Sequence, residues 1–272
     1  VATTPEGFKF THQQFVKEAN LTPAKRALYG MIQASTYDNE ANLPDDYISS
    51  LYESYPPQLI SAYLRGQFVN LTSGAVYPDF DRKLNHTDEE IQPHENLIIG
   101  MDFNVLKMAA VVYVIREGKP LALDEMVGVR DTPTMATLLI ERFPFHEMTV
   151  IPDAAGQSTS SKNSSESDHQ ILRDKGFRVE VSGTNPAIKD RINTVNALIL
   201  NGDGERTLLV NTNKCPRFTE TLEQQVYDDF GMPDKKSGLD HVGDAGGYPL
   251  AKRFPIIKPV LSIRDIPIFG RR

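Results

Sequence analysis

The hydrophobic pattern of the chain changes character near residue 97. Upstream of that point, apolar residues recur at helical spacing in short stretches that prolines and polar residues interrupt. We expect helices around residues 12–18, 42–52 and 59–64, with a further apolar segment near residues 27–32. Residues 68–80 are typical of short strands around a Ser73-Gly74 turn, and residues 81–96 have the polar composition of a linker. The sequence therefore predicts a mainly helical N-terminal extension that leads into a second domain.

From residue 97 onward, apolar runs of strand length alternate with amphipathic stretches. A turn at Glu117-Gly118-Lys119 joins two of the first three strands and marks them as an antiparallel hairpin. The expected strands lie at residues 97–101, 108–115, 121–127, 150–151, 178–181 and 208–210, and the expected helices at residues 132–143, 168–175, 185–199 and 216–229. This order predicts an α/β fold with a mixed five-stranded sheet flanked by helices, in which residues 208–210 form only a brief strand.

Composition narrows the classes of function. The 272 residues carry a net charge of −7, whereas proteins that bind nucleic acid tightly are usually basic. An acidic site neutralised by its own metal ions remains compatible with this charge, but we expect the chain alone to bind DNA weakly. The single cysteine, Cys215, excludes an internal disulfide, and no apolar run is long enough to cross a bilayer. The chain has no Gly-x-x-x-x-Gly-Lys-Ser/Thr loop, so we expect no ATP hydrolysis.

Aspartates at the ends of apolar elements are the main candidates for chemistry. Asp102 and Asp153 each end a strand-like run, and Asp240 and Asp244 lie four residues apart on a predicted helix. Buried carboxylates are costly unless a cation meets them, and Mg²⁺ and Mn²⁺ prefer carboxylate oxygen. The pattern predicts a two-metal phosphodiester hydrolase with Asp240 as the main ligand of its pair and Asp244 as a second or outer ligand. The competing interpretation is structural: turn residues at Asp102 and Asp153, and a helix-start residue at Asp240.

Charged residues near these aspartates form a second set of candidates. Lysine and arginine dominate contacts to DNA phosphates, although each such residue is equally well explained as a solvated surface charge. The histidine beside Asp240 fits a metal-tuning or phosphate-contacting role, or a structural hydrogen-bond donor. These candidates are Lys189, Arg191, Lys235, Lys236 and His241. We expect another acidic pair, Asp124-Glu125, to face solvent within its strand.

Seven stretches, in order along nearly the whole chain, carry a family resemblance. They are residues 2–8 (ATTPEGF), 63–69 (YLRGQFV), 74–81 (GAVYPDFD), 99–103 (IGMDF), 150–153 (VIPD), 189–196 (KDRINTVN) and 240–245 (DHVGDA). Each is weakly diagnostic by itself, whereas the ordered set is specific. The chain resembles the C-terminal part of the large terminase subunit of tailed bacteriophages, the DNA-packaging motor with a headful nuclease.

The resemblance implies a ribonuclease H-like fold in which Asp102, Asp153 and Asp240 are catalytic, with two Mg²⁺ or Mn²⁺ ions. It implies an endonuclease that cuts double-stranded viral DNA during genome packaging, with a portal ring and a small terminase subunit as partners. The expected division is a remnant of the ATPase core at 1–40, a linker region at 41–96, the nuclease domain at 97–258 and a C-terminal tail at 259–272. We expect an isolated monomer in the host cell cytoplasm, absent from the mature virion.

Two alternatives to this function stay open at the level of sequence. One is a catalytically silent module that docks DNA or the portal, and the other is a different ribonuclease H-like enzyme such as a resolvase. One departure from the family is local: Gly246-Gly247-Tyr248-Pro249 follows the last motif, so we expect that helix to be short or frayed. The tail suits an extended tether to the portal, with packing back onto the nuclease as the alternative.

Overall fold

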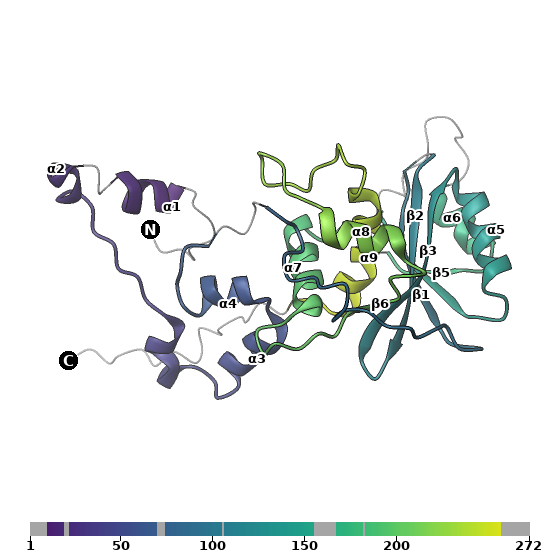
Figure 1. Cartoon of the computed structure of the whole chain (residues 1–272), viewed down its shortest axis with the longest axis horizontal. Helices are drawn as coiled ribbons and strands as arrows, with labels where there is room; N and C mark the ends of the chain where they lie inside the picture. The colour runs from purple at the N-terminus through teal and green to yellow at the C-terminus, as the bar shows by residue number, and fades with distance from the viewer. Residues whose placement is uncertain are drawn as a thin grey trace.

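The computed structural model describes residues 10–18, 22–69, 74–104, 106–154, 167–181 and 183–256 (Figure 1). The predicted C-terminal tail lies outside these residues. The N-terminal part is mainly helical, as the pattern predicted. Its elements are α1 (Phe10–His12), a π-helix (Gln13–Glu18), α2 (Pro23–Arg26), a 3₁₀ helix (Thr36–Asn42), α3 (Tyr47–Ser54) and α4 (Pro57–Tyr63). Among the described helices, none has the length and apolar character that a membrane span requires.

The rest of the chain is built on one mixed sheet with the strand order β5-β4-β1-β2-β3-β6. The strands are β1 (Leu97–Asp102), β2 (Met108–Arg116), β3 (Lys119–Val129), β4 (Met148–Pro152), β5 (Arg178–Val179) and β6 (Leu209–Val210). The first three pair antiparallel, whereas β4 and β5 continue the sheet in parallel from β1. The predicted fold class is confirmed, but the sheet has six strands rather than five, because β6 pairs in parallel with Leu121 and Ala122 of β3.

Helices cover both faces of this sheet (Figure 1). One face carries α5 (Thr132–Arg142) and α6 (Asp168–Asp174), and the other carries α7 (Ile188–Ile199), α8 (Pro216–Gln224) and α9 (Asp240–Arg253). Alternate residues of β2 enter two different cores: Val112 packs with the first group and Val111 with the second. A strand buried on both faces reads as a continuous apolar run, and this explains why residues 108–115 carry no polar alternation.

The final helix, α9, is a continuous element of 14 residues, so the expectation of a short or frayed helix is wrong. Its glycines allow close packing that outweighs their low helix propensity. A Cβ at Gly246 would clash with the ring of Phe218, and one at Gly247 would stand 2.8 Å from the Arg191 side chain. The Tyr113 hydroxyl also donates to the carbonyl of Gly246 at 3.0 Å. Tertiary contacts therefore stabilise a helix that the local sequence disfavours.

Residues 81–96 contain no regular helix or strand, yet they are tied to the edge of the sheet. Asn85 is fully buried, and its amide donates to the carbonyls of Ile199 and Leu208 at 3.1 and 3.0 Å. The backbone N–H of Thr87 donates to the carbonyl of Val210 at 3.0 Å. This polar segment therefore packs as part of the α/β domain.

Candidate metal centre

Two of the predicted aspartates lie at the carboxyl ends of strands that are parallel neighbours. Asp102 is the last residue of β1, and Asp153 directly follows β4, whose Pro152 pairs with Met101. The backbone N–H of Asp153 extends this ladder by donating to the carbonyl of Met101 at 3.0 Å. Carboxyl ends of parallel strands lie at the same edge of a sheet, so both side chains begin from one edge.

The other two aspartates arrive on α9, which packs across β1 and β2. Gly100 makes this approach close: a Cβ there would clash with the carbonyl of Ala245 and stand 2.6 Å from Pro249. Pro249 has no N–H to donate to that carbonyl, which faces the β1 backbone instead. Asp240 begins the helix, and Asp244 lies one turn further along it. The helix therefore holds this pair against the strand that ends in Asp102.

Two of the four carboxyl groups, Asp102 and Asp244, have raised pKa values. Burial first, and then the charge of Asp244, raise the pKa of Asp102 to about 6, with a smaller contribution from Asp153. Burial likewise raises the pKa of Asp244, and the charge of Asp240 adds to that effect, while Arg191 opposes it. Asp102 and Asp240 are each only 8% exposed. Negative charge thus gathers where solvent screens it poorly.

His241 belongs to this cluster through a direct contact with Asp102. Its Nδ1 lies 3.1 Å from Oδ2 of Asp102, and its Nε2 lies 2.7 Å from the amide nitrogen of Asn104. An amide nitrogen can only donate, so Nε2 accepts from Asn104 and Nδ1 carries the proton that it donates to Asp102. The sequence analysis missed Asn104, although it stands only two residues after Asp102.

Arg191 is not a surface charge. It is 4% exposed, forms an ion pair with Asp244, and lies with its guanidinium carbon 4.6 Å from the centre of the Tyr248 ring. The surface interpretation is therefore wrong for this residue, because the inner face of α7 carries it with Ile192 and Val195. Its position on that apolar stripe was the signal that the sequence offered.

The three candidate lysines all lie at the surface: Lys189 at the start of α7, and Lys235 and Lys236 in the loop before α9. Lys235 is near enough for its charge to lower the pKa of Asp244, after the larger effect of Arg191. The two loop lysines precede Asp240 by a few residues, so they flank the start of the helix that carries the acidic pair.

Asp153 has its own supporting residues, which the sequence analysis did not single out. The side-chain amide of Asn185 donates to Asp153, and the Asn185 oxygen accepts from the N–H of Ala154 at 2.8 Å. Nε2 of the buried His169 lies 2.9 Å from the carbonyl oxygen of Asp153. These contacts hold the end of β4 in place.

The pair Asp124-Glu125 is buried, so the expectation that it faces solvent is wrong. Glu125 accepts hydrogen bonds from the backbone N–H groups of Arg217 and Phe218, both at 2.8 Å, and so caps the N-terminus of α8. Asp124 forms an ion pair with Arg142 at 3.0 Å. Both carboxylates are thus satisfied within the protein and have a structural role.

Within the described ranges, no three Asp, Glu, His or Cys side chains stand close enough together to hold a metal ion as they are placed. Asp102 is bonded to His241, Asp153 to Asn185 and Asp244 to Arg191. Asp240 differs, because its buried Oδ1 has no hydrogen-bond partner among the described residues. A buried carboxylate oxygen without a hydrogen-bond donor is stabilised when a cation binds to it. The four aspartates offer only oxygen ligands, which a hard divalent cation prefers, and they could bind one together after their side chains rotate away from their present partners.

The sheet order, the flanking helices and the aspartates at one sheet edge define a ribonuclease H-like α/β domain. Residues 99–253 match the family described as the terminase RNaseH-like domain. Residues 1–84 match the family described as terminase large subunit, T4likevirus-type, N-terminal. The chain belongs to the large terminase subunit family, as the sequence motifs predicted. No curated protein matches the sequence closely enough to count as a relative.

Solved structures of two phage proteins share the fold. The large terminase of the thermophilic bacteriophage D6E is 17% identical with a TM-score of 0.67, and the match covers 92% of this chain and 61% of that one. The P22 large terminase nuclease domain is 19% identical with a TM-score of 0.52, and the match covers 69% of this chain and 96% of that one. At these identities the likeness shows the fold alone, and the chain spans less than two thirds of the D6E protein.

Proposed function

We propose that this chain is the nuclease portion of a terminase large subunit, a metal-dependent endonuclease that cuts double-stranded viral DNA during genome packaging. The observation that carries the proposal is that Asp102 and Asp153 lie at the carboxyl ends of neighbouring parallel strands, while α9 packs across β1 and carries Asp240, whose buried Oδ1 has no hydrogen-bond partner among the described residues. The raised pKa of Asp102, caused by burial and then by the charge of Asp244, supports it. The fold shared with the P22 nuclease domain agrees with it.

Asp102, Asp153 and Asp240 are the residues that would hold two Mg²⁺ or Mn²⁺ ions, with Asp244 as a second or outer ligand. When bound, a pair of such ions supplies an activated water and stabilises the leaving oxygen of the phosphodiester. The protein orients the ligands: His241 holds Asp102, and Asn185 holds Asp153. Such supporting groups commonly affect metal affinity by 10-fold to 100-fold when they are removed, in order-of-magnitude terms.

Arg191 has a separate task in this arrangement. Its ion pair with Asp244 neutralises one of the negative charges on α9. This neutralisation reduces the repulsion between α9 and the aspartates at the ends of β1 and β4. A ligand role for Asp244 requires its release from Arg191. The freed guanidinium is then well placed to meet a phosphate, because arginine binds phosphate and carboxylate with the same fork geometry.

The surface lysines are the groups that would contact DNA first. Lys189, Lys235 and Lys236 are exposed near the start of α7 and α9. The net charge of −7 provides little long-range attraction for a polyanion, so DNA binding by the isolated chain rests on few side chains and falls steeply with salt. In the intact motor, which also includes the small subunit, the ATPase and the portal ring would supply positioning. We place the isolated chain as a monomer in the host cytoplasm and outside the mature virion.

One observation favours a second candidate, a module that docks DNA or the portal without cutting. The described acidic side chains do not form a ready-made ligand set. The two functions differ in their dependence on divalent cations, because docking through surface lysines needs no metal, whereas hydrolysis by the carboxylates does.

A plasmid assay separates these functions. The whole chain is incubated with supercoiled plasmid and Mn²⁺ or Mg²⁺, with and without chelator, beside Asp102→Asn, Asp153→Asn and Asp240→Asn. Asp124→Asn is the matched control, because Asp124 is also buried but forms its ion pair with Arg142 and not with a residue of the proposed metal centre. We expect cutting that chelator abolishes and that each of the three variants loses by about 100-fold or more, while the control retains it. Cutting at the wild-type rate by all three variants, or cutting in chelator, contradicts the proposal.

A further inference from the structure

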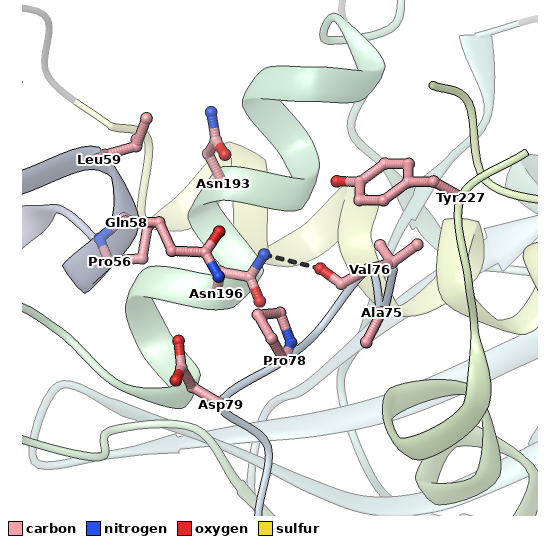
Figure 2. Close-up of a pocket in the computed structure, with 10 residues that line it drawn as sticks. All are labelled: Pro56, Gln58, Leu59, Ala75, Val76, Pro78, Asp79, Asn193, Asn196 and Tyr227. Carbon is pink, nitrogen blue, oxygen red and sulfur yellow. Dashed lines mark hydrogen bonds between the residues drawn. The ribbon is translucent and has the colours of Figure 1, made fainter. Parts of the chain in front are cut away.

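Residues 75–77 lie upstream of the ribonuclease H-like family match but pack as part of the α/β domain. The match begins at residue 99, yet Ala75 already bridges to Val226 after α8. The N–H of Val76 donates to the carbonyl of Gln225 at 2.8 Å. The side chain of Asn196 in α7 donates back to the carbonyl of Val76 at 2.9 Å, as Figure 2 shows. This segment is therefore fixed by α7 on one side and by the chain after α8 on the other.

Tyr77, the residue after Val76, packs against α9 next to its acidic pair, Asp240 and Asp244. Tyr77 is buried, and its hydroxyl lies 3.6 Å from the position that a Cβ on Gly243 would occupy. Gly243 immediately precedes Asp244, so the tyrosine packs against the turn of helix between Asp240 and Asp244. Burial raises the pKa of Tyr77, the charge of Asp244 raises it further, and Arg191 acts in the opposite direction. The phenol thus packs against the backbone next to Asp244, within electrostatic reach of the Asp244–Arg191 ion pair.

We propose that Tyr77 is a positioning residue of the metal centre, which acts through the Asp244–Arg191 ion pair on how readily Asp244 meets a cation. This inference rests on the proposed function. It also places the start of the working nuclease near residue 75 rather than at residue 97, because a domain cut at 97 lacks Tyr77 and the segment that holds it.

The physical reason lies in local polarity. A hydroxyl dipole beside a buried ion pair partly solvates both charges, whereas a phenyl ring there offers them none of this compensation. Removing the hydroxyl therefore raises the cost of separating Arg191 from Asp244, because the freed guanidinium is then left with less polar compensation in its buried position. A carboxylate that is held more tightly by arginine is less available to a cation. Tyr77→Phe should accordingly weaken cation binding while it leaves the packing of the ring intact.

The test measures Mn²⁺ binding to the whole chain by titration calorimetry without DNA, so it does not depend on catalysis. Tyr227→Phe is the matched control, because Tyr227 lies in the same region (Figure 2) but only burial raises its pKa, to about 12, with no contribution from Asp244 or Arg191. We expect Tyr77→Phe to bind Mn²⁺ about threefold to tenfold more weakly, less than the loss for a group bonded directly to a ligand. Its melting temperature should match that of the control.

A second background tests the route of the effect. In Asp244→Asn the ion pair is absent, so adding Tyr77→Phe should cause no further loss of Mn²⁺ affinity, a non-additivity expected of coupled residues. Wild-type affinity in Tyr77→Phe, an equal loss in Tyr227→Phe, or an undiminished loss in the Asp244→Asn background each overturns the inference. If the wild-type chain itself binds no Mn²⁺, the proposed metal centre fails and this inference fails with it. If Asp102→Asn loses the cation but Tyr77→Phe does not, only the inference fails.

Discussion

Replacing Asp102 with asparagine is expected to stabilise the metal-free protein, although the same change should abolish its proposed activity. The buried carboxylate of Asp102 faces the charges of Asp244 and Asp153, and His241 offsets them only in part. Asparagine has nearly the same shape and carries no charge. The variant therefore removes repulsion from the sheet edge and leaves the packing around β1 unchanged.

The pKa of Asp102 sets the size and the pH range of this effect. Burial and neighbouring charge raise it from 3.8 to about 6. Since the folded carboxyl holds its proton more tightly than the unfolded one, ionisation costs stability as pH rises from 3.8 through about 6. The raised pKa corresponds to about 3 kcal/mol at most, so we expect Asp102→Asn to gain about 1–3 kcal/mol in free energy of unfolding near pH 7.5. The gain should shrink as the pH falls toward about 4 and should be lost near about pH 3, where the wild-type carboxyl is mostly protonated in both states.

Urea denaturation in chelator, at several pH values, measures this gain. Asp131→Asn is a suitable control, because hydrogen bonds from Thr134 lower the pKa of Asp131 and removing its charge should bring no gain. Saturating Mn²⁺ should reverse the order, because a cation that binds the folded wild type stabilises it by mass action and the variant has lost a ligand. If Asp102→Asn is less stable than wild type near pH 7.5 in chelator, the argument from uncompensated charge is refuted.

Three further changes test other parts of the structure. Arg191→Gln leaves Asp244 buried without its partner and should lower the free energy of unfolding by about 3–5 kcal/mol, part of which Mn²⁺ restores; unchanged stability in urea denaturation would show that no such pair forms. Gly100→Ala should force α9 away from β1 and reduce both stability and Mn²⁺ affinity. If calorimetry gives the variant the melting temperature and the Mn²⁺ affinity of the wild type, α9 does not approach β1 this closely. Glu125→Gln should cost about 1–3 kcal/mol through the α8 cap without changing plasmid cutting, and a loss of cutting in the folded variant would place Glu125 at the site.

The sequence pattern predicted that Asp102 and Asp153 each end a strand, and the resemblance to the ribonuclease H-like fold predicted that these two strand ends are neighbours. Each aspartate ends an apolar run, and parallel neighbouring strands present their carboxyl ends at one edge. Helices α5, α7 and α8 were predictable from sequence for a local reason, since their apolar positions recur at the helical period, whereas the full length of α9 was not. Patterns of this sort depend only on neighbours along the chain.

The residues that surround the aspartates depend on contacts between distant segments, and local patterns do not report them. Arg191 reaches Asp244 only because α7 packs beside α9, and the Glu125 carboxylate finds its donors on α8. The glycines of α9 have low helix propensity, and only the packing of the Phe218 ring against Gly246 explains why the helix continues through them. The polar composition of residues 81–96 likewise concealed the buried hydrogen bonds of Asn85.

The proposed function requires that the carboxylates of Asp102, Asp153 and Asp240 bind divalent cations together. The most direct test is anomalous diffraction from crystals of the whole chain soaked in Mn²⁺, because manganese scatters anomalously and its positions can be read without assumptions about activity. We predict two peaks bounded by these three side chains, with Asp244 at their margin, and no peaks there in crystals of Asp102→Asn. A manganese peak elsewhere on the protein with none among these carboxylates would contradict the account.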